Sequence, residues 1–190
     1  MKSNKIIRVN EIIRNHLIDG CVYTAYSLDN QAMLYIKEIT DADILANVSD
    51  KLKASICQQF KEWKDDDPEM LNGWLENTYK SILGKLTNDY LIYTDDMGNV
   101  SKYKAQMSRN CYVNIKHPIT GNYLNINNLV ANLKNGYLTI KEKRKRCVGD
   151  HIDQNKYNNS FENIRLITQK ENSKNKGNKY VFIRVFEQMV

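Results

Sequence analysis

Residues 147–177 carry the pattern that most restricts how this chain can fold. A short strand-like stretch is followed by a polar, turn-rich loop and by a second strand-like run at residues 164–167. Thr168 then stands where a helix N-cap belongs, and Glu171, three residues later, completes a capping box. The segment therefore predicts two short strands joined by a loop, followed by a helix over residues 169–176, which together make a ββα unit.

The polar residues of this unit suit the hydrolysis of phosphodiesters. Asp150 lies in the first strand and Asn172 in the helix, so the unit can bring the two together. Carboxylate and amide oxygens are hard ligands, which suit Mg²⁺ or Mn²⁺ better than Zn²⁺. His151, beside Asp150, can take a proton from water as a neutral imidazole. These residue types predict a metal-dependent hydrolytic site.

The run that begins at Asp150, DHIDQNKYNNSFENIRLITQKENSKNK, strongly resembles the HNH endonucleases of the ββα-metal superfamily, in particular the branch found in phage homing endonucleases. The resemblance covers about residues 148–176, and residues 110–134 look like the portion that usually precedes this motif. Two loop positions depart from the family pattern, since Gln154 replaces the usual turn glycine and Phe161 replaces a frequent proline. The residue types that carry the chemistry are all present.

The resemblance implies a role for each matching residue. His151 would be the general base that activates water, and Asn163 would be the middle asparagine, whose amide holds the His151-bearing loop in place. Asp150 and Asn172 would bind one divalent ion, Mg²⁺ or Mn²⁺, and Asn172 stands where many relatives have the last histidine. The implied reaction is the in-line hydrolysis of a phosphodiester, which leaves 5′-phosphate and 3′-hydroxyl ends.

The net charge of +6 is divided unevenly along the chain. Residues 1–100 carry 11 Lys or Arg against 16 Asp or Glu, a net charge of −5, whereas residues 101–190 carry 17 against 6, a net charge of +11. A basic half of this density is typical of nucleic-acid-binding proteins, although a solvated basic face explains it equally well. We expect phosphate contacts from these basic residues: Lys143, Arg144, Lys145, Arg146, Arg165, Lys170, Lys174 and Lys176.

The acidic first half has the apolar spacing of helices. Side chains at three- and four-residue intervals predict helices over residues 6–17, 48–63 and 71–86. Asp67, followed by a proline at the first helical position, predicts an N-cap for the last of these. The helices are expected to form a structural core.

Short β-prone runs begin near residue 89 and predict a different architecture. They indicate a strand at residues 90–94, a hairpin over 112–115 and 123–126, a short helix over 127–133 and a strand after 178. The expected fold class is therefore α+β, with a helical N-terminal region followed by a C-terminal ββα-metal (HNH) nuclease domain. The expected division assigns residues 1–96 to an acidic, mainly helical region of unassigned role. Residues 97–190 form the basic HNH endonuclease domain, with its core motif at 147–177.

Other residues that could carry chemistry are given structural roles. His117 precedes a proline in the hairpin turn and is expected to be exposed, and His16 is expected to pack on a helix. Cys147 is expected to pack beneath its strand, and Asp153 to brace the loop rather than supply a second metal carboxylate. The four cysteines form no CxxC pair, which is typical of reduced thiols in a cytoplasmic protein.

The sequence favours a metal-dependent DNA endonuclease that nicks or cuts double-stranded DNA, and the resemblance implies a phage or mobile-element origin. One alternative is a non-catalytic nucleic-acid-binding protein on a degenerate HNH scaffold, and another is a structure-selective or RNA-directed nuclease. The N-terminal region could support oligomerisation, bind a protein partner or form a separate recognition module. No apolar run approaches the roughly 18 residues that a membrane-spanning helix needs.

Overall fold

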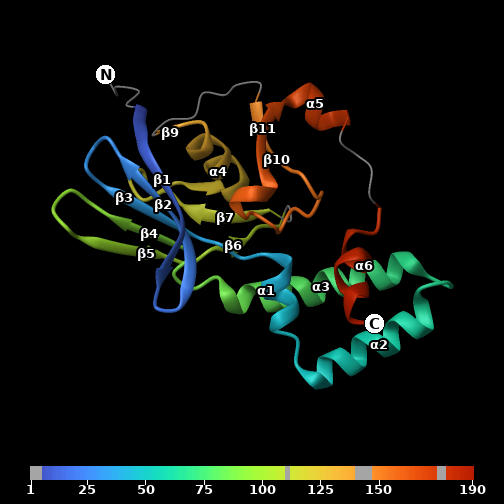
Figure 1. The fold of residues 1–190 in the computed structure, drawn as a ribbon. Helices are drawn as coiled ribbons and strands as arrows, with labels where there is room; N and C mark the ends of the chain where they lie inside the picture. The colour runs from blue at the N-terminus through green and yellow to red at the C-terminus, as the bar shows by residue number, and fades with distance from the viewer. Residues whose placement is uncertain (1–5, 110–111, 140–146, 175–178) are drawn as a thin grey trace. The chain divides into compact units, whose positions relative to one another are not determined.

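The computed structural model describes residues 6–109, 112–139, 147–174 and 179–190 (Figure 1). The chain divides into two compact units. The first unit takes Met1–Glu38 and Thr87–Lys176, and the second takes Ile39–Leu86 and Gly177–Val190. Among the described residues, every strand belongs to the first unit.

The largest element of the first unit is an antiparallel sheet. Within the described residues it has six strands, in the order β5-β4-β3-β2-β1-β9. Its strands are β1 (Ile6–Ile18), β2 (Cys21–Leu28), β3 (Met33–Lys37), β4 (Leu91–Thr94), β5 (Val100–Tyr103) and β9 (Tyr137–Thr139). The buried residues of β2 and β3, such as Tyr26 and Leu34, form the centre of its core. The strand expected at residues 90–94 is confirmed as β4.

The helix expected over residues 6–17 is wrong, because these residues form strand β1. Asp19 and Gly20 both have positive φ angles, 50° and 80°, and Ile18 pairs with Cys21 across them. A two-residue Asp-Gly turn of this kind closes a β-hairpin, so Asp19 and Gly20 form the turn between β1 and β2. The apolar spacing did not mark a buried helical face, since Leu17 is 68% exposed.

A second, smaller sheet and a helix lie between β5 and β9 of the large sheet in the sequence. The sheet is made of β6 (Gln106–Met107), β7 (Val113–Lys116) and β8 (Tyr123–Asn125), and helix α4 (Ile126–Lys134) follows it directly. The predicted hairpin and short helix are therefore confirmed. Helix α4 packs against both strands of the ββα unit, as Figure 1 shows in gold and orange.

The predicted ββα unit is confirmed. Strand β10 (Cys147–His151) pairs with β11 (Ile164–Thr168), the loop between them ends in the 3-10 turn η1 (Phe161–Asn163), and helix α5 (Gln169–Lys174) follows. The capping box is present, because the Thr168 N–H donates to the Glu171 carboxylate and the Glu171 N–H donates to the Thr168 hydroxyl.

The backbone of β10 meets the first turn of α4 at Gly149. The Asn127 side chain donates to the Gly149 carbonyl oxygen at 2.8 Å, and the Gly149 N–H donates to the Asn128 side chain at 2.9 Å. A Cβ atom at Gly149 would clash with the Asn127 carbonyl group, 2.6 Å from its carbon. The strand can therefore approach the helix this closely only with glycine at this position.

The second unit is helical among its described residues. It contains α1 (Asp41–Ala46), α2 (Asp50–Trp63), α3 (Pro68–Leu86), α6 (Val181–Phe186) and the 3-10 turn η2 (Glu187–Met189). The helices predicted over 48–63 and 71–86 are confirmed. The predicted cap is confirmed as well, since the Met70 N–H donates to the Asp67 carboxylate at 3.1 Å.

The strand expected after residue 178 is wrong where the structure describes the chain, because residues 181–186 form α6. The side chain of Asn72 in α3 accepts hydrogen bonds from the N–H groups of Phe182 and Ile183 and so caps the start of α6. The rings of Phe182 and Phe186 pack edge-on against Tyr79. These contacts with α3 outweigh the β propensity of the aromatic and β-branched run.

Two further findings bear on the expected layout. The mixed α/β class is confirmed, but the helical N-terminal region is not, since the described residues begin with three strands of the sheet. Strands β4 and β5 pair with each other although the expected boundary at residue 96 falls between them in the sequence. The division into functional domains at 1–96 and 97–190 stays a prediction. No helix of the described residues is long and apolar enough to cross a membrane.

Replacing Gly149 by alanine should lower the free energy of unfolding by about 1–3 kcal/mol or more, because the new methyl group forces β10 away from α4. Gly73→Ala in α3 is the matched control, since no described atom lies within 4 Å of its Cβ position. That control should gain about 0.4–1 kcal/mol. Urea denaturation of both variants measures the difference, and equal stabilities would contradict the close approach at Gly149.

Candidate active site

His151 is the last residue of β10, and its side chain is buried, with 8% of the residue exposed. Its ring nitrogen Nε2 lies 2.7 Å from the Asn159 side-chain oxygen. An amide oxygen can only accept, so this contact places the proton of the neutral imidazole on Nε2. The lone pair of the ring is then on Nδ1, the nitrogen that can accept a proton from water.

Burial lowers the pKa of His151 below its ordinary value, because an imidazolium ion loses hydration in this position. The hydrogen bond with Asn159 and the nearby carboxylates of Asp153 and Asp150 oppose that shift. The balance keeps the ring neutral at a pH where an exposed histidine is partly protonated. A neutral ring is the form that can act as a base.

The loop between β10 and β11 is held by its own polar side chains. Asn163 accepts a hydrogen bond from the Asp153 N–H and donates both to the Asp153 carboxylate and to the Asn158 carbonyl oxygen. The Asp153 carboxylate also accepts from the Asn155 N–H and from the Asn158 side chain. Asp153 thus braces the loop, as predicted, and the Asn163 side chain bonds within the same network. Asn159 directly follows Asn158 in the chain, so this network also fixes the position of Asn159, whose side chain contacts the His151 ring.

Asp150 precedes His151 and is buried, with 6% of the residue exposed. The Arg165 Nε–H donates to its Oδ2 at 2.9 Å, an ion pair that the sequence did not indicate. The Arg165 side chain is 49% exposed and its guanidinium has further donors, so it can still contact a phosphate. The ion pair sets the orientation of the Asp150 carboxylate.

Asn172 lies on α5, which packs against β10 and β11, and its side chain is half-buried there. Among the described residues, no cluster of three or more His, Cys, Asp or Glu is placed to hold a metal ion. Asp150 and Asn172 nevertheless fit Mg²⁺ or Mn²⁺, because these ions prefer oxygen ligands and commonly take only one or two from the protein, the rest from water and phosphate. The donor chemistry of the two residues is compatible with such an ion.

The predicted phosphate-binding residues are only partly within the described structure. Lys170 and Lys174 are exposed on α5, which packs against β11 and against β10, the strand that carries Asp150 and His151. Lys143, Arg144, Lys145, Arg146 and Lys176 lie outside the described residues. The described part therefore shows a basic helix next to the candidate site.

Two residues away from the site differ from expectation, and the expectation for a third, Cys147, is not tested. His117 is buried at 5% exposure, because its Nδ1 accepts hydrogen bonds from the N–H groups of Ile119 and Thr120 and so closes the hairpin turn. His16 lies in β1 instead of a helix, with its ring 5.3 Å from that of Tyr35. The side chain of Cys147 is outside the described part.

Sequence reasoning did not single out Asn159 or the residues that clamp Gly149. A signal existed for the glycine, since a glycine inside a strand often marks the close approach of another backbone. For Asn159 the only signal was its place in the Asn158-Asn159 pair of the resembling motif. Its contact with the ring of His151 follows from the folded loop.

Residues 127–174 match the model of a family described as HNH endonuclease. The matched segment, called the HNH segment below, is about a quarter of the chain. It begins at Asn127, in the first turn of α4, and ends at Lys174 in α5, so it includes the Gly149 contact and the whole ββα unit. This match supports the HNH family and points to nuclease activity on a nucleic acid. No curated protein and no solved structure matches the chain.

The His151 ring of the HNH segment should titrate, in metal-free protein, with a pKa below the ordinary value of about 6.5, because the ring is buried. Below that pH the unfolded chain binds a proton at this residue that the folded chain does not. This histidine therefore makes folding less stable as the pH falls below about 6.5. An NMR titration of the His151 imidazole measures the pKa, and a value at or above 6.5 would contradict the effect of burial.

Proposed function

We propose that this protein is a metal-dependent DNA endonuclease that hydrolyses phosphodiester bonds in double-stranded DNA. The observation that carries the proposal is a buried, neutral histidine, His151, whose ring is oriented by Asn159 and which directly follows the buried Asp150 in β10. These residues lie within the HNH segment. The net charge of +11 over residues 101–190 supports a polyanionic substrate.

In this proposal His151 is the general base. Its Nδ1 accepts a proton from the water molecule that attacks the phosphorus atom in line with the leaving oxygen. The bond from phosphorus to the 3′-oxygen breaks, the 3′-oxygen takes a proton from solvent, and the products carry 5′-phosphate and 3′-hydroxyl ends. Asn163 acts on the loop and not on the substrate, since its side chain bonds to Asp153 and to the Asn158 backbone.

Asp150 and Asn172 are the residues that we propose to hold one divalent ion, Mg²⁺ or Mn²⁺. HNH nucleases in general use a divalent metal ion. Bound there, the ion supplies a Lewis acid for the phosphate oxygen. Arg165 keeps the Asp150 carboxylate in a fixed orientation and neutralises part of its charge before an ion arrives.

The duplex is held, in this proposal, by basic residues of the ββα unit and of the sequence that directly precedes and follows it. Lys170 and Lys174 on α5 and Arg165 on β11 contact phosphates from the described part, joined by Lys176 and by the basic run at residues 143–146. A cytoplasmic location, a phage or mobile-element origin and the homing branch of the family stay predictions from the sequence.

The variant His151→Ala should lose cleavage by about 10²–10⁴-fold, because it removes the base. Its affinity for duplex DNA should stay nearly that of wild type, because His151 is buried and is not a phosphate anchor. A plasmid relaxation assay with Mg²⁺, Mn²⁺ or EDTA measures cleavage, and a filter-binding assay in EDTA measures affinity. His16→Ala in β1 is the matched control and should cleave normally.

Three outcomes of that assay would count against the proposal. Wild-type protein that binds duplex DNA but leaves varied plasmid and phage DNA intact would favour a binding protein on a degenerate HNH scaffold. Cleavage retained in His151→Ala would remove His151 as the base. Cleavage unaffected by EDTA would remove the divalent ion from the mechanism.

Neutralising the basic run with Lys143→Gln, Arg144→Gln, Lys145→Gln and Arg146→Gln should weaken binding and flatten its dependence on salt. Each lost phosphate contact lowers the slope of log K against log[salt] by about 0.9. The control replaces four exposed lysines of α2 and its C-cap by glutamine, namely Lys51, Lys53, Lys61 and Lys64, which makes the same change in charge. Equal slopes for the two variants would show that net charge, and not a local contact, drives binding.

A further inference from the structure

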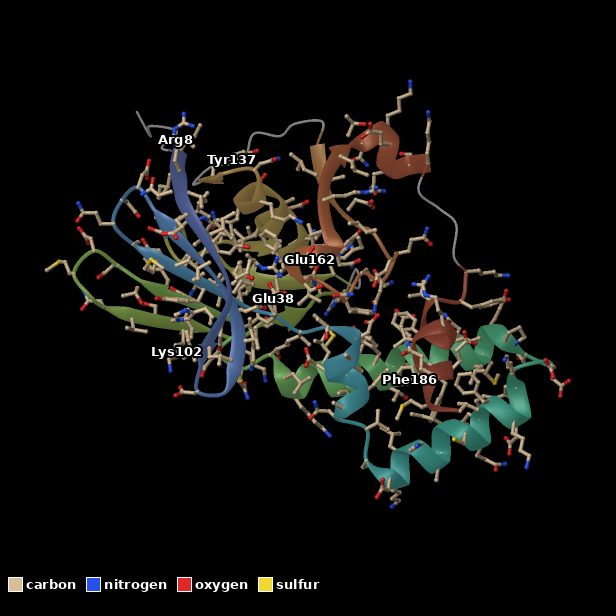
Figure 2. The ribbon with its side chains drawn as sticks, in the orientation of Figure 1. Arg8, Glu38, Lys102, Tyr137, Glu162 and Phe186 are labelled. Atoms are coloured by element: carbon tan, nitrogen blue, oxygen red, sulfur yellow. The ribbon has the colours of Figure 1, made fainter. Side chains whose placement is uncertain are left out.

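The loop of the HNH segment is attached to the large sheet at Phe161. The Phe161 N–H donates to Oε2 of Glu38 at 3.0 Å, and the hydroxyl of Thr24 donates to Oε1 of the same carboxylate at 2.7 Å. Glu38 follows directly after β3, and Thr24 is fully buried in β2. Both carboxylate oxygens of Glu38 therefore accept a hydrogen bond, which fixes the orientation of the carboxylate that binds the loop. Figure 2 labels Glu38 and also Glu162, which follows Phe161 in the sequence.

The side chain of Phe161 is held from the same sheet and from α4. The guanidinium carbon of Arg14, in β1, lies 4.0 Å from the ring centroid, and Arg14 also donates to the Glu162 carboxylate, which lowers the pKa of Glu162. Nζ of Lys134, in α4, lies 4.4 Å from the same centroid and donates to the carbonyl oxygens of Phe161 and Ile164. The ring that replaces the frequent proline of the family is thus a contact point for two cations.

A short series of covalent and hydrogen bonds connects Phe161 to His151. Phe161 begins the turn η1, which ends at Asn163, and the Asn163 carbonyl oxygen accepts the Ile152 N–H directly after His151. The Asn163 side chain binds Asp153 and the backbone of Asn158, the residue before Asn159. A displacement of η1 therefore moves the Asn163 carbonyl oxygen away from the Ile152 N–H and shifts the Asn159 oxygen relative to the His151 ring.

We propose that Arg14 and Glu38 are positioning residues for His151, although both lie outside the HNH segment. They hold η1 in place, and through Asn163 and Asn159 they hold the imidazole in the orientation and tautomer that the reaction needs. The inference rests on the proposed function for its effect on catalysis. Its structural half, the coupling of the sheet to the loop, can be measured without any cleavage.

The test uses the full chain with Glu38→Gln and Arg14→Met. Glutamine has the shape of glutamate, but it carries no charge and an NH2 group takes the place of one acceptor oxygen. That NH2 can face the Thr24 hydroxyl but not the Phe161 N–H, so the charge-assisted hydrogen bond to the loop becomes a weaker, neutral one. Methionine keeps an apolar stem over the Phe161 ring but removes the charge, at a side chain that is 31% exposed. The matched controls are Glu11→Gln and Arg8→Met, exposed residues of β1.

Both test variants should lower kcat by about 10-fold or more with KM changed less than about 2-fold, since they misplace the base without touching the substrate. The controls should keep wild-type kcat. Arg14→Lys returns a cation to the ring and should recover part of the kcat that Arg14→Met loses. Wild-type kcat in folded Glu38→Gln and Arg14→Met would overturn the proposal.

Amide hydrogen exchange in metal-free protein is the second readout. In Glu38→Gln the amides of Ile152 and Asp153, far from the substitution in sequence, should exchange faster, whereas those of β2 should keep their protection. Faster exchange at Phe161 alone would show a local contact and overturn the coupling. If wild-type protein does not cleave DNA, the proposed nuclease fails, and exchange still decides whether Glu38 holds the loop.

Discussion

The candidate site depends on the close approach of two backbones, at Gly149 in β10 and at Asn127 in α4. A side chain at Gly149 would separate them, and the amides of Asn127 and Asn128 bond to the backbone N–H and carbonyl group that this approach would otherwise leave unpaired. Asp150 and His151 follow immediately in the chain. Their place relative to α4 is therefore set by backbone geometry that no side-chain rotation can relax.

The loop that follows shows why the polar residues are so dense. Asn155, Asn158, Asn159 and Asn163 are all buried, and a buried amide without partners costs free energy. The side chains of Asn158 and Asn163 donate to Asp153, that of Asn155 accepts from the Tyr157 N–H, and that of Asn159 lies against the His151 ring. A network with these partners has one favoured arrangement, which orients Asn159 toward His151. Attachment at Phe161 places the whole arrangement against the large sheet.

Local signals predicted the elements of the site, and contacts between distant residues decided the elements around it. The capping box of Thr168 and Glu171 and the Asp67 cap could be recognised from a few neighbouring residues, and both are confirmed. Strand β1 was missed because three- and four-residue apolar spacing over residues 6–17 outweighed the Asp19-Gly20 turn signal. Helix α6 was missed because its cap, Asn72, is more than a hundred residues away in the sequence.

The sequence by itself determined the ββα unit, the adjacency of Asp150 and His151 and the charge of the surrounding chain, because these follow from neighbouring residues and their spacing. Tertiary structure alone decided which nitrogen of His151 carries the proton, that Arg165 pairs with Asp150, and that Arg14 and Glu38 reach the loop. These contacts form between residues that are separated in the sequence and come together only in the folded chain. No local sequence pattern specifies these contacts, because the burial and hydrogen bonding of each residue depend on the whole folded structure.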